Sequence, residues 1–426
     1  MRIAFFSPPF FSHLQAMDAI AEQLAARGHE AFLVAHPDLA EQIPSSLRLL
    51  PLDAQRCQWS PATCLRHARQ PAFPFGVRRT ISDMVHITRS LVEQAPALLR
   101  EHGIEAVVCD QMEGGGALVA DHLDLPFVSI AVAAPINREP LVPLPVLDWP
   151  YEDSEAAKKR NKVGERIADF LTAPHDRLIR NSAAALGCAP KARLSDCLSP
   201  LAQISQLTAG FDFPRHHLPD SFHYVGALRS PSGSASGQPM PAISRDRPFV
   251  FTSFGTLQGH RFRLFQPIAR ACRALDVQLM IAHCGGLTAA QADNLDADWV
   301  VNRVSQAEAL TQADLVITHA GLNTVVDAIA AAVPMLCIPL AFDQPGMAAR
   351  VQRAGLGEVV SSRASQKSLS AAIDRLLRER SRIRLAAEPF ARDIAAAGGA
   401  EHAARLIEQA FLMRQPVTRP AMEVAA

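Results

Sequence analysis

Residues 315–344 read LVITHAGLNTVVDAIAAAVPMLCIPLAFDQ, and this stretch decides the class of fold. A short apolar run, Leu315–Thr318, is followed by a segment, 321–332, whose apolar residues recur at helical spacing. A second apolar run, Met335–Ile338, comes next. Two short buried strands joined by a helix form a βαβ unit, in which the strands run parallel. The stretch therefore predicts a parallel sheet with helices on both faces.

The same alternation continues on both sides of this stretch. In the second half of the chain it also predicts strands at 249–253, 278–282, 299–302 and 358–360. Further helices are predicted at 262–274, 344–354, 366–379 and 382–411, the last of them interrupted at Gly398-Gly399. In the first half it predicts strands at 3–6, 31–35, 47–50, 106–109, 127–130, 204–207 and 223–225, with helices at 14–27, 81–99, 114–122 and 153–186. Each half is therefore predicted to be a doubly wound α/β domain.

One segment separates the two halves. Residues 229–247, RSPSGSASGQPMPAISRDR, are rich in Ser, Gly and Pro and contain few large apolar side chains, which is typical of a linker. We therefore predict an N-terminal domain over 1–228 and a C-terminal domain over 248–413. The last helix is expected to pack back on the N-terminal domain, and residues 414–426 are expected to form a flexible tail.

The composition excludes several classes of function. Lys plus Arg (42) equals Asp plus Glu (42), so the chain lacks the basic surface that general nucleic-acid binding needs. No run of about 20 residues is apolar and free of charge and proline, so we expect no membrane-spanning helix. Pro8 and Pro9 interrupt the apolar start, so we expect no signal peptide. The eight cysteines form no CxxC pair, which favours reduced thiols, a cytoplasmic location and no zinc site.

Two polar residues in the first half follow strands that we expect in one sheet. His13 comes after the 3–6 strand, at the start of a helix, and Asp110 directly follows the 106–109 strand. Ligands of open α/β sheets bind beyond the carboxyl ends of the strands, where both residues fall. An Asp–His pair can act as a general base, because the carboxylate fixes the imidazole tautomer and stabilises the imidazolium. The alternative is that His13 only begins a helix and Asp110 only ends a strand.

A second group of polar residues follows strands of the second half. After the 315–318 strand, the sequence THAGLNT (318–324) runs directly into a helix, where Gly321 allows close approach to the backbone. The first N–H groups of a helix are unpaired and suit a phosphate. Each residue alone also has an ordinary explanation, such as an N-cap. Together they predict a nucleotide-sugar site formed by Thr256, by His319, Gly321, Asn323, Thr324 and Asp327, and by Asp343 and Gln344.

Three other motifs carry no predicted function. The glycines at 114–116 do not form G-x-G-x-x-G, so a hydride-transfer enzyme is not expected. The D-x-D at 296–298 has the spacing by which some sugar transferases hold a metal, but it precedes a strand instead of following one. His216 and His217 have no further ligand at metal spacing. We therefore predict no metal site.

The stretch His319–Gln344 resembles the donor-site signature of the UDP-glycosyltransferase family. The N-terminal SPPFFSH, which ends at His13, and Arg27–His29 resemble the catalytic-histidine segment of the same family. The resemblance extends from Ile3 to about Leu406 and so covers nearly the whole chain. It implies the GT-B fold, in which two Rossmann-like domains face each other across a cleft, and transfer of a sugar with inversion.

The resemblance also implies roles for individual residues. His13 would be the base and Asp110 its partner. The diphosphate would lie on His319, Gly321, Asn323 and Thr324 with Thr256 nearby, and the sugar hydroxyls would lie on Asp343 and Gln344. Asp327 falls where the family has a ribose-binding glutamate, and its side chain is shorter.

Two departures from the family pattern concern the donor base and the catalytic loop. Plant members stack the uracil on a tryptophan, whereas this chain has Arg303-Val304-Ser305-Gln306 there. Arg303 and Val304 are therefore expected beside the base, with the Arg303 guanidinium plane able to stack on it. This leaves the choice between UDP and dTDP open. Ser12 replaces the glycine that is usual before the catalytic histidine.

The function implied is transfer of glucose from UDP-glucose to the hydroxyl groups of a carotenoid diol, without a metal or other cofactor. The apolar segments 73–99 and 127–147 would line the acceptor side. The residues leave open another lipophilic alcohol, such as a macrolide or a sterol, because acceptor pockets are built from variable loops. A non-catalytic activator with the same fold and a nucleotide-sugar epimerase are further alternatives.

The helix expected at 153–186 bears on location. It carries Lys158, Lys159, Arg160 and Lys162, and next to them Val163, Ile167, Phe170 and Leu171 recur at helical spacing. A helix with a basic and an apolar face can lie on an anionic membrane surface, which suits a water-insoluble acceptor. The alternative is that the apolar residues pack on the N-terminal domain and the charges are only solvated.

Overall fold

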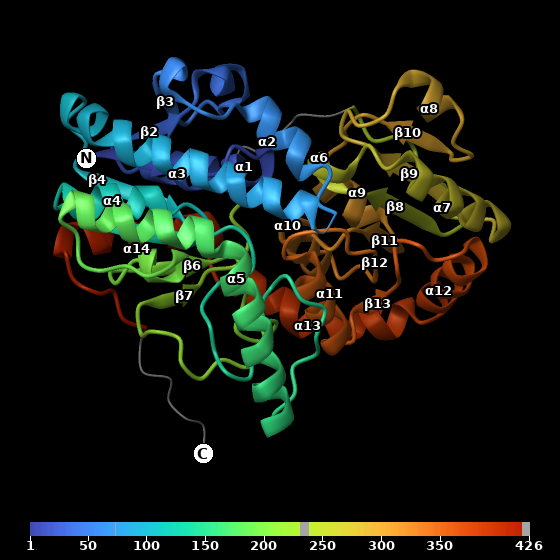
Figure 1. The fold of residues 1–426 in the computed structure, drawn as a ribbon. Helices are drawn as coiled ribbons and strands as arrows, with labels where there is room; N and C mark the ends of the chain where they lie inside the picture. Colours follow the sequence, from blue (N-terminus) through green and yellow to red (C-terminus); the bar gives the residue numbers. More distant parts are fainter. Residues whose placement is uncertain (73, 231–237, 420–426) are drawn as a thin grey trace.

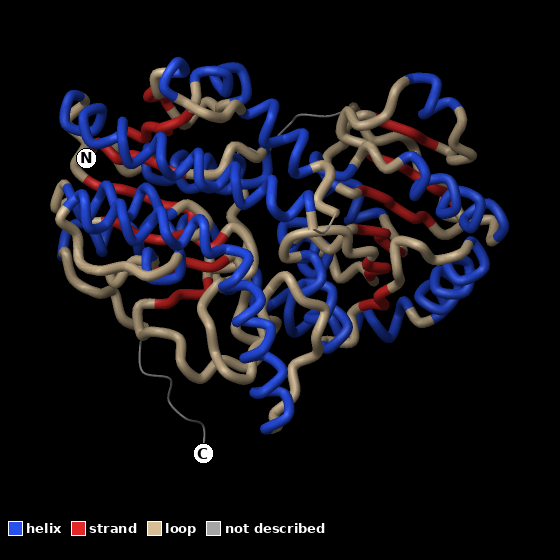
Figure 2. The backbone as a smooth tube through the Cα atoms, viewed as in Figure 1, coloured by secondary structure: helices blue, strands red, loops and turns tan. Residues whose placement is uncertain are grey.

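The structure is a computed structural model that describes residues 1–72, 74–230 and 238–419. Within these residues the chain forms two parallel sheets, of seven and six strands, with helices around each (Figure 1). Figure 2 shows the strands gathered in two separate groups, each enclosed by helices. The predicted fold class, two doubly wound Rossmann-like domains, is confirmed.

The N-terminal sheet has the order β3-β2-β1-β4-β5-β6-β7, and all of its pairings are parallel. Its strands are β1 (Arg2–Phe6), β2 (Glu30–Ala35), β3 (Arg48–Pro51), β4 (Ala106–Asp110), β5 (Phe127–Ala131), β6 (Gln203–Ser205) and β7 (Phe222–Tyr224). The helices are α1 (Phe11–Ala25), α2 (Pro61–Ala68), α3 (Phe75–Glu101), α4 (Gly114–His122) and α5 (Glu155–Leu186). The strand order reverses between β1 and β4, and ligands of such sheets bind at this switch point.

The C-terminal sheet has the order β10-β9-β8-β11-β12-β13, again all parallel. Its strands are β8 (Phe249–Ser253), β9 (Gln278–Ala282), β10 (Trp299–Val301), β11 (Leu315–Thr318), β12 (Met335–Cys337) and β13 (Gly357–Val359). Its helices are α6 (Gly255–Gln258), α7 (Phe262–Ala274), α8 (Ala289–Asp293), α9 (Gln306–Gln312), α10 (Leu322–Ala330), α11 (Gln344–Arg353), α12 (Gln366–Arg378) and α13 (Arg380–Ala396). Here the switch point lies between β8 and β11.

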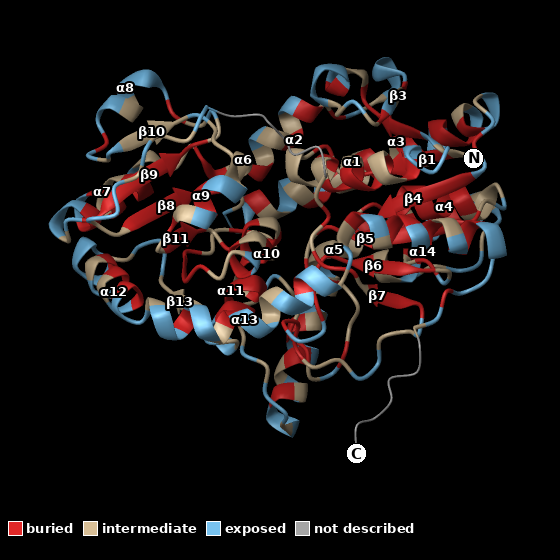
Figure 3. Cartoon of the chain, turned by 180° about the vertical axis from the view of Figure 1, so that it is seen from behind, coloured by how far each residue is buried: buried red, intermediate tan, exposed pale blue. Residues whose placement is uncertain are grey.

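The central strands are buried on both faces, which explains their continuous apolar sequences. One apolar cluster covers each face of each sheet, and the buried strands stand out in Figure 3. The last helix, α14 (Gly399–Met413), packs against α1 and contributes Ala403, Ile407 and Phe411 to a core of the N-terminal domain. The chain therefore crosses back from the second domain to the first.

The predicted elements agree closely with the structure. For example, the helix expected at 262–274 is α7, and the strand expected at 278–282 is β9. The short helices α2, α6, α8 and α9 were not expected, because four to eight residues are too few to show a helical period.

The expected flexible tail needs a correction for residues 414–419. Val417 is buried, its N–H donates to the Leu201 carbonyl at 2.8 Å, and its carbonyl bonds Nε2 of His223 at 2.7 Å. Residues 414–419 are therefore packed against the N-terminal domain and not flexible. Residues 420–426 of the tail and 231–237 of the linker lie outside the described residues. Gln238 already pairs with Val304 of the C-terminal domain.

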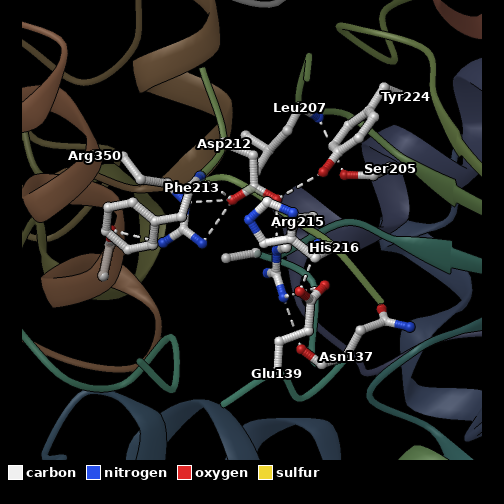
Figure 4. A network of polar contacts seen from close by, with 12 residues as sticks. Asn137, Glu139, Ser205, Leu207, Asp212, Phe213, Arg215, His216, Tyr224 and Arg350 are labelled. Atoms are coloured by element: carbon white, nitrogen blue, oxygen red, sulfur yellow. Dashed lines mark hydrogen bonds and ion pairs between the residues drawn. The ribbon is translucent and has the colours of Figure 1, made fainter. Parts of the chain in front are cut away.

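A buried ion pair joins the two domains (Figure 4). Arg350 of α11 contacts Oδ1 of Asp212, from the loop between β6 and β7, through Nη2 at 2.7 Å and Nε at 2.8 Å. Arg215 Nε and the Tyr224 hydroxyl bond the other oxygen at 3.1 and 2.9 Å. Although burial opposes ionisation, the two guanidinium groups keep the pKa of Asp212 below its usual value. Loss of one partner would leave a buried charge unpaired, so breaking this contact between the domains is costly.

Candidate active site

The catalytic pair expected from the sequence forms at the switch point of the N-terminal sheet. His13 lies in the first turn of α1, after β1, and Asp110 is the last residue of β4. Nδ1 of His13 lies 2.6 Å from Oδ2 of Asp110, and Oδ1 of Asp110 accepts the Met112 N–H at 2.8 Å. The carboxylate is thus held on both oxygens and orients the imidazole. No described residue bonds Nε2 of His13, so this nitrogen is available to accept a proton.

The charges around His13 favour its protonated form. Burial lowers the pKa of His13, but the Asp110 charge, the hydrogen bond with Asp110 and the Asp343 charge together outweigh burial and raise it above 6.5. A raised pKa makes the imidazole a stronger base. The pair can therefore take a proton from an alcohol and stabilise the imidazolium that results.

The expected phosphate site lies at the switch point of the C-terminal sheet. The N-cap residue of helix α10 is Gly321, which has no side chain. The first N–H groups of the helix therefore donate no hydrogen bond to a capping side chain. The ring of His319 lies against two glycines: a Cβ on Gly321 would be 2.6 Å from Nε2, and one on Gly255 would be 3.3 Å from it. Burial lowers the pKa of His319 to about 4, so it is a neutral hydrogen-bond donor. Thr256 lies next to Gly255 in α6.

The other expected diphosphate and ribose residues take part in one hydrogen-bond network. Asn323 bonds the N-terminal domain, with Oδ1 3.0 Å from Gln206 Nε2 and Nδ2 3.4 Å from the Ser12 carbonyl. The Thr324 hydroxyl donates to Gln306 Oε1 at 3.2 Å. Asp327 accepts from Gln306 Nε2 at 2.7 Å. These contacts bring the residue before His13 next to the start of α10.

The expected sugar-binding residues lie at the start of α11, facing the catalytic pair. Asp343 Oδ2 accepts the Ala134 N–H at 3.0 Å, so it reaches across the domain interface. Burial raises the pKa of Asp343, opposed by the Ala134 N–H and the charge of His13. Gln344 is buried, and its Oε1 accepts the N–H groups of Leu340 and Ala341 at 2.9 and 2.8 Å. Gln344 thus shapes the turn, and no residue in the described ranges bonds its NH₂ group.

The two residues expected beside the donor base lie after β10. The Arg303 guanidinium lies over the Phe11 ring, 4.5 Å from its centroid, and so stacks on an aromatic group from the N-terminal domain. Val304 forms a parallel bridge with Gln238. Both residues therefore lie where the two domains and the end of the linker meet.

Two structural observations concern the acceptor side and metals. An open hollow of about 410 Å³ on α3 is lined by Phe75, Arg78, Arg79 and Ser82. It lies in the 73–99 segment predicted to line the acceptor side, of which residue 73 is outside the described residues. Within the described ranges no three His, Cys, Asp or Glu side chains are placed to hold a metal ion. The D-x-D carboxylates instead pair with arginines, Asp296 with Arg273 and Asp298 with Arg247.

Sequence reasoning missed several polar residues at this interface. Gln206, Arg229 and Gln306 bond the expected donor residues, and Asp212 pairs with Arg350. Gln306 stands in the segment that replaces the family tryptophan, which was a usable signal. The others lie in loops, or next to the linker, where no periodic pattern marks them.

Comparison with solved structures identifies the fold class. The structure matches the crystal structure of the glycotransferase of kitacinnamycin with a TM-score of 0.74 at 19% identity, over 96% of this chain and 98% of that one. This match gives the chain the GT-B fold, in which two Rossmann-like domains face each other. The His13–Asp110 pair lies at one switch point and the uncapped start of α10 at the other.

Sequence comparisons identify the family. The model of the family "UDP-glucoronosyl and UDP-glucosyl transferase" matches residues 76–384. The chain is 45% identical to the zeaxanthin glucosyltransferase of Pseudescherichia vulneris, over 97% of this chain and 99% of that protein. It is 40% identical to the zeaxanthin glucosyltransferase of Pantoea ananas, over 96% of each. The chain therefore belongs to the UDP-glycosyltransferase family.

Proposed function

We propose that the protein transfers glucose from UDP-glucose to the hydroxyl groups of zeaxanthin, a carotenoid diol, and inverts the configuration at the sugar carbon. The observation that carries this proposal is the His13–Asp110 contact of 2.6 Å, which makes a general base at the domain interface. Two relatives of 45% and 40% identity are zeaxanthin glucosyltransferases, which supports this acceptor. A non-catalytic activator would not need the base.

In the proposed reaction the acceptor hydroxyl lies between Nε2 of His13 and the anomeric carbon of the donor. Its oxygen forms the new bond to that carbon while its proton passes to Nε2. The bond from the carbon to the diphosphate breaks on the opposite face, and UDP leaves with the electron pair. A single displacement of this kind inverts the sugar carbon.

The leaving diphosphate is proposed to be stabilised by fixed donors without a metal. The first N–H groups of α10 and the neutral His319 ring are donors at the place where negative charge develops. Activity should therefore survive EDTA. Loss of activity with EDTA, followed by recovery on adding a divalent metal, would contradict this part of the proposal.

The direct test is to incubate the purified protein with UDP-glucose and zeaxanthin and to detect mono- and diglucosides by mass. The expected result is both products from the parent and a loss of about 100-fold or more in rate for His13→Ala, with UDP binding retained. A macrolide or sterol offered in place of zeaxanthin tests the runner-up acceptors. Faster transfer to one of these than to zeaxanthin would replace the proposed acceptor.

We also propose a cytoplasmic location, with peripheral contact between α5 and an anionic membrane. No helix within the described part of the chain is long and apolar enough to cross a membrane. On α5, the side chains of Val163, Ile167 and Phe170 are 53%, 57% and 81% exposed. More than half of the surface of each is open to solvent, and Lys159 and Lys162 are exposed on the same stretch of helix. An apolar ridge next to lysines suits a lipid surface, from which the acceptor would be collected.

The structure separates the four basic residues clustered at 158–162 of this helix into two pairs. Lys158 lies 2.7 Å from Glu155, and Arg160 lies 3.5 Å from Glu152, so these two charges are compensated within the protein. Lys159 and Lys162 have no ion pair with any described residue. Lys159→Gln with Lys162→Gln should weaken binding to anionic liposomes by about 30-fold, at about 1 kcal/mol per charge. The control, Lys158→Gln with Arg160→Gln, changes the net charge equally and should bind nearly as the parent does. An equal loss of liposome binding in both double variants would refute the proposal that the side of α5 with Lys159 and Lys162 faces the lipid.

A further inference from the structure

Arg229, the first residue of the predicted linker segment, lies inside the domain interface. Its Nε and Nη2 lie 2.9 and 2.8 Å from Oδ1 of Asp327, and Nη2 also donates to the Asn323 carbonyl at 3.0 Å. Its Nη1 donates to Gln206 Oε1 at 3.0 Å and to the Leu228 carbonyl at 2.9 Å. All three guanidinium nitrogens are therefore bonded, which fixes the group in one orientation.

These contacts join Arg229 to two residues of the donor site. Gln206 is fully buried, and it accepts from Arg229 while it donates to Asn323 Oδ1 at 3.0 Å. Asp327 receives Arg229 on Oδ1 and Gln306 Nε2 on Oδ2 at 2.7 Å. The Asp327 carboxylate is thus held from both sides, by Arg229 of the linker and by Gln306 of the C-terminal domain. Three N–H groups already contact the Asp327 carboxylate. Since a carboxylate can accept about four hydrogen bonds, Oδ2 retains capacity for one hydroxyl group.

We propose that Arg229 is a positioning residue of the donor site, which holds the Asp327 carboxylate for a ribose hydroxyl of the nucleotide. The inference rests on the proposed function, since it assumes a ribonucleotide donor. Aspartate is one methylene shorter than glutamate, so its carboxylate stays close to the axis of α10. Because the Arg229 guanidinium bonds Oδ1 of Asp327 through two nitrogens, it also fixes the orientation of Oδ2. Arg229 would act through Asp327 and not on the phosphates.

The test is to measure, by titration calorimetry, the affinities of the full chain for UDP and for 2′,3′-dideoxy-UDP, which lacks both ribose hydroxyls. Arg229→Gln should weaken UDP binding at least about tenfold, the effect of one lost charge-assisted bond. It should change the affinity for the dideoxy analogue little. Asp327→Asn should give the same pattern, and the double variant should be no weaker than either single variant, because both act on one contact.

Controls separate this role from a structural one. Arg375→Gln removes an arginine that pairs with Glu358 at 2.7 Å on the outer side of the C-terminal domain. It should leave the affinities for UDP and for the dideoxy analogue unchanged. Arg229→Lys keeps the charge but loses the planar guanidinium with its several donors, so it should give an intermediate loss of UDP affinity. It carries the test if Arg229→Gln does not fold.

Three results would overturn the inference. Parental UDP affinity in Arg229→Gln would show that the residue is not needed. Equal losses for UDP and the dideoxy analogue would show that it acts on the phosphates or on the fold. Absence of UDP binding in the parent would instead overturn the proposed function, and the inference with it.

Discussion

Replacement of Asp110 by Asn would test the catalytic pair most directly. The Asn oxygen would keep the bond to the Met112 N–H, which lies 2.8 Å from Oδ1, and the NH₂ group would turn toward His13. Nδ1 of His13 would then accept a hydrogen bond, and the neutral ring would carry its proton on Nε2. This is the nitrogen that has to accept the proton of the acceptor. The rate should therefore fall although the geometry barely changes.

Two effects set the size of this loss. The buried 2.6 Å contact becomes a charge-assisted bond when His13 is protonated, and such a bond is worth about 1.5–3 kcal/mol. That alone corresponds to about 10–150-fold in rate. The wrong tautomer removes general-base catalysis, which contributes about 10²–10⁴-fold. The two effects act on one proton transfer and do not add, so we expect kcat to fall by about 10²–10⁴-fold.

The pH dependence of the rate gives an independent measure. His13 acts as a base only when neutral, so the rate falls as the pH drops below the pKa of His13. In the parent, burial lowers this pKa and the charges of Asp110 and Asp343 raise it, with a net increase. Without the Asp110 charge the pKa falls, so the acid limb of the profile should move to lower pH while the plateau drops. A variant that had only lost folded protein would show a lower plateau with an unmoved limb.

The assay is glucoside formation under single-turnover conditions across the acid range, with UDP affinity measured in parallel. Asp121→Asn is a matched control, because Asp121 pairs with Lys191 at 2.9 Å elsewhere in the N-terminal domain. It should leave both the plateau and the limb unchanged. If Asp110→Asn kept a near-parental kcat, or if its acid limb did not move, the assignment of the pair as general base would be refuted.

Three further predictions concern the donor site, the domain interface and the core. Gly321→Ala should weaken UDP binding by about tenfold or more in calorimetry, because the new Cβ would lie 2.6 Å from His319 Nε2, and unchanged affinity would contradict the proposed site. Arg350→Met should lower the free energy of unfolding by about 3–5 kcal/mol in urea titrations, since it leaves Asp212 buried without its main partner, and a loss below about 1 kcal/mol would refute this. Burial lowers the pKa of His175 to about 4, so the unfolded chain binds a proton that the folded chain does not as the pH falls from 6.5. His175→Gln should remove this contribution to the loss of unfolding free energy between pH 6.5 and about 4. Identical slopes of unfolding free energy against pH in variant and parent would exclude a role of His175.

The fold was predictable because its signals are local. Each central strand is buried on both faces, so it appears in the sequence as a short apolar run, such as Phe249–Ser253. Each long helix carries an apolar stripe, as α7 does, and several end or begin at a glycine in the left-handed region, such as Gly187 after α5. The tail was mispredicted because its polar, proline-containing sequence gives no sign of the carbonyl of Leu201 or the ring of His223 that hold it.

The site residues were predictable where the topology alone brings them together. His13 and Asp110 are far apart in sequence, but each directly follows a strand at the switch point of one sheet, so the parallel order places them side by side. The same reasoning grouped His319 with Thr256, after β11 and β8, and the structure places the His319 ring against Gly255, the neighbour of Thr256. In both cases one sheet supplies all of the geometry.

The residues that were missed act between the two sheets, where no such rule applies. Gln206 meets Asn323 across 117 positions of sequence, Arg229 meets Asp327 across 98, and Arg350 meets Asp212 across 138. In each pair one partner belongs to a loop of the first domain or, for Arg229, to the linker. The other partner belongs to a helix of the second domain, so their meeting depends on the angle between the domains. That angle is set by the packing of the whole interface, which no local periodicity encodes. Asp343, which is expected to bind the sugar, also reaches across the interface to Ala134. The same packing therefore decides how the donor half faces the proposed base, so the interdomain contacts and the proposed chemistry depend on one geometry.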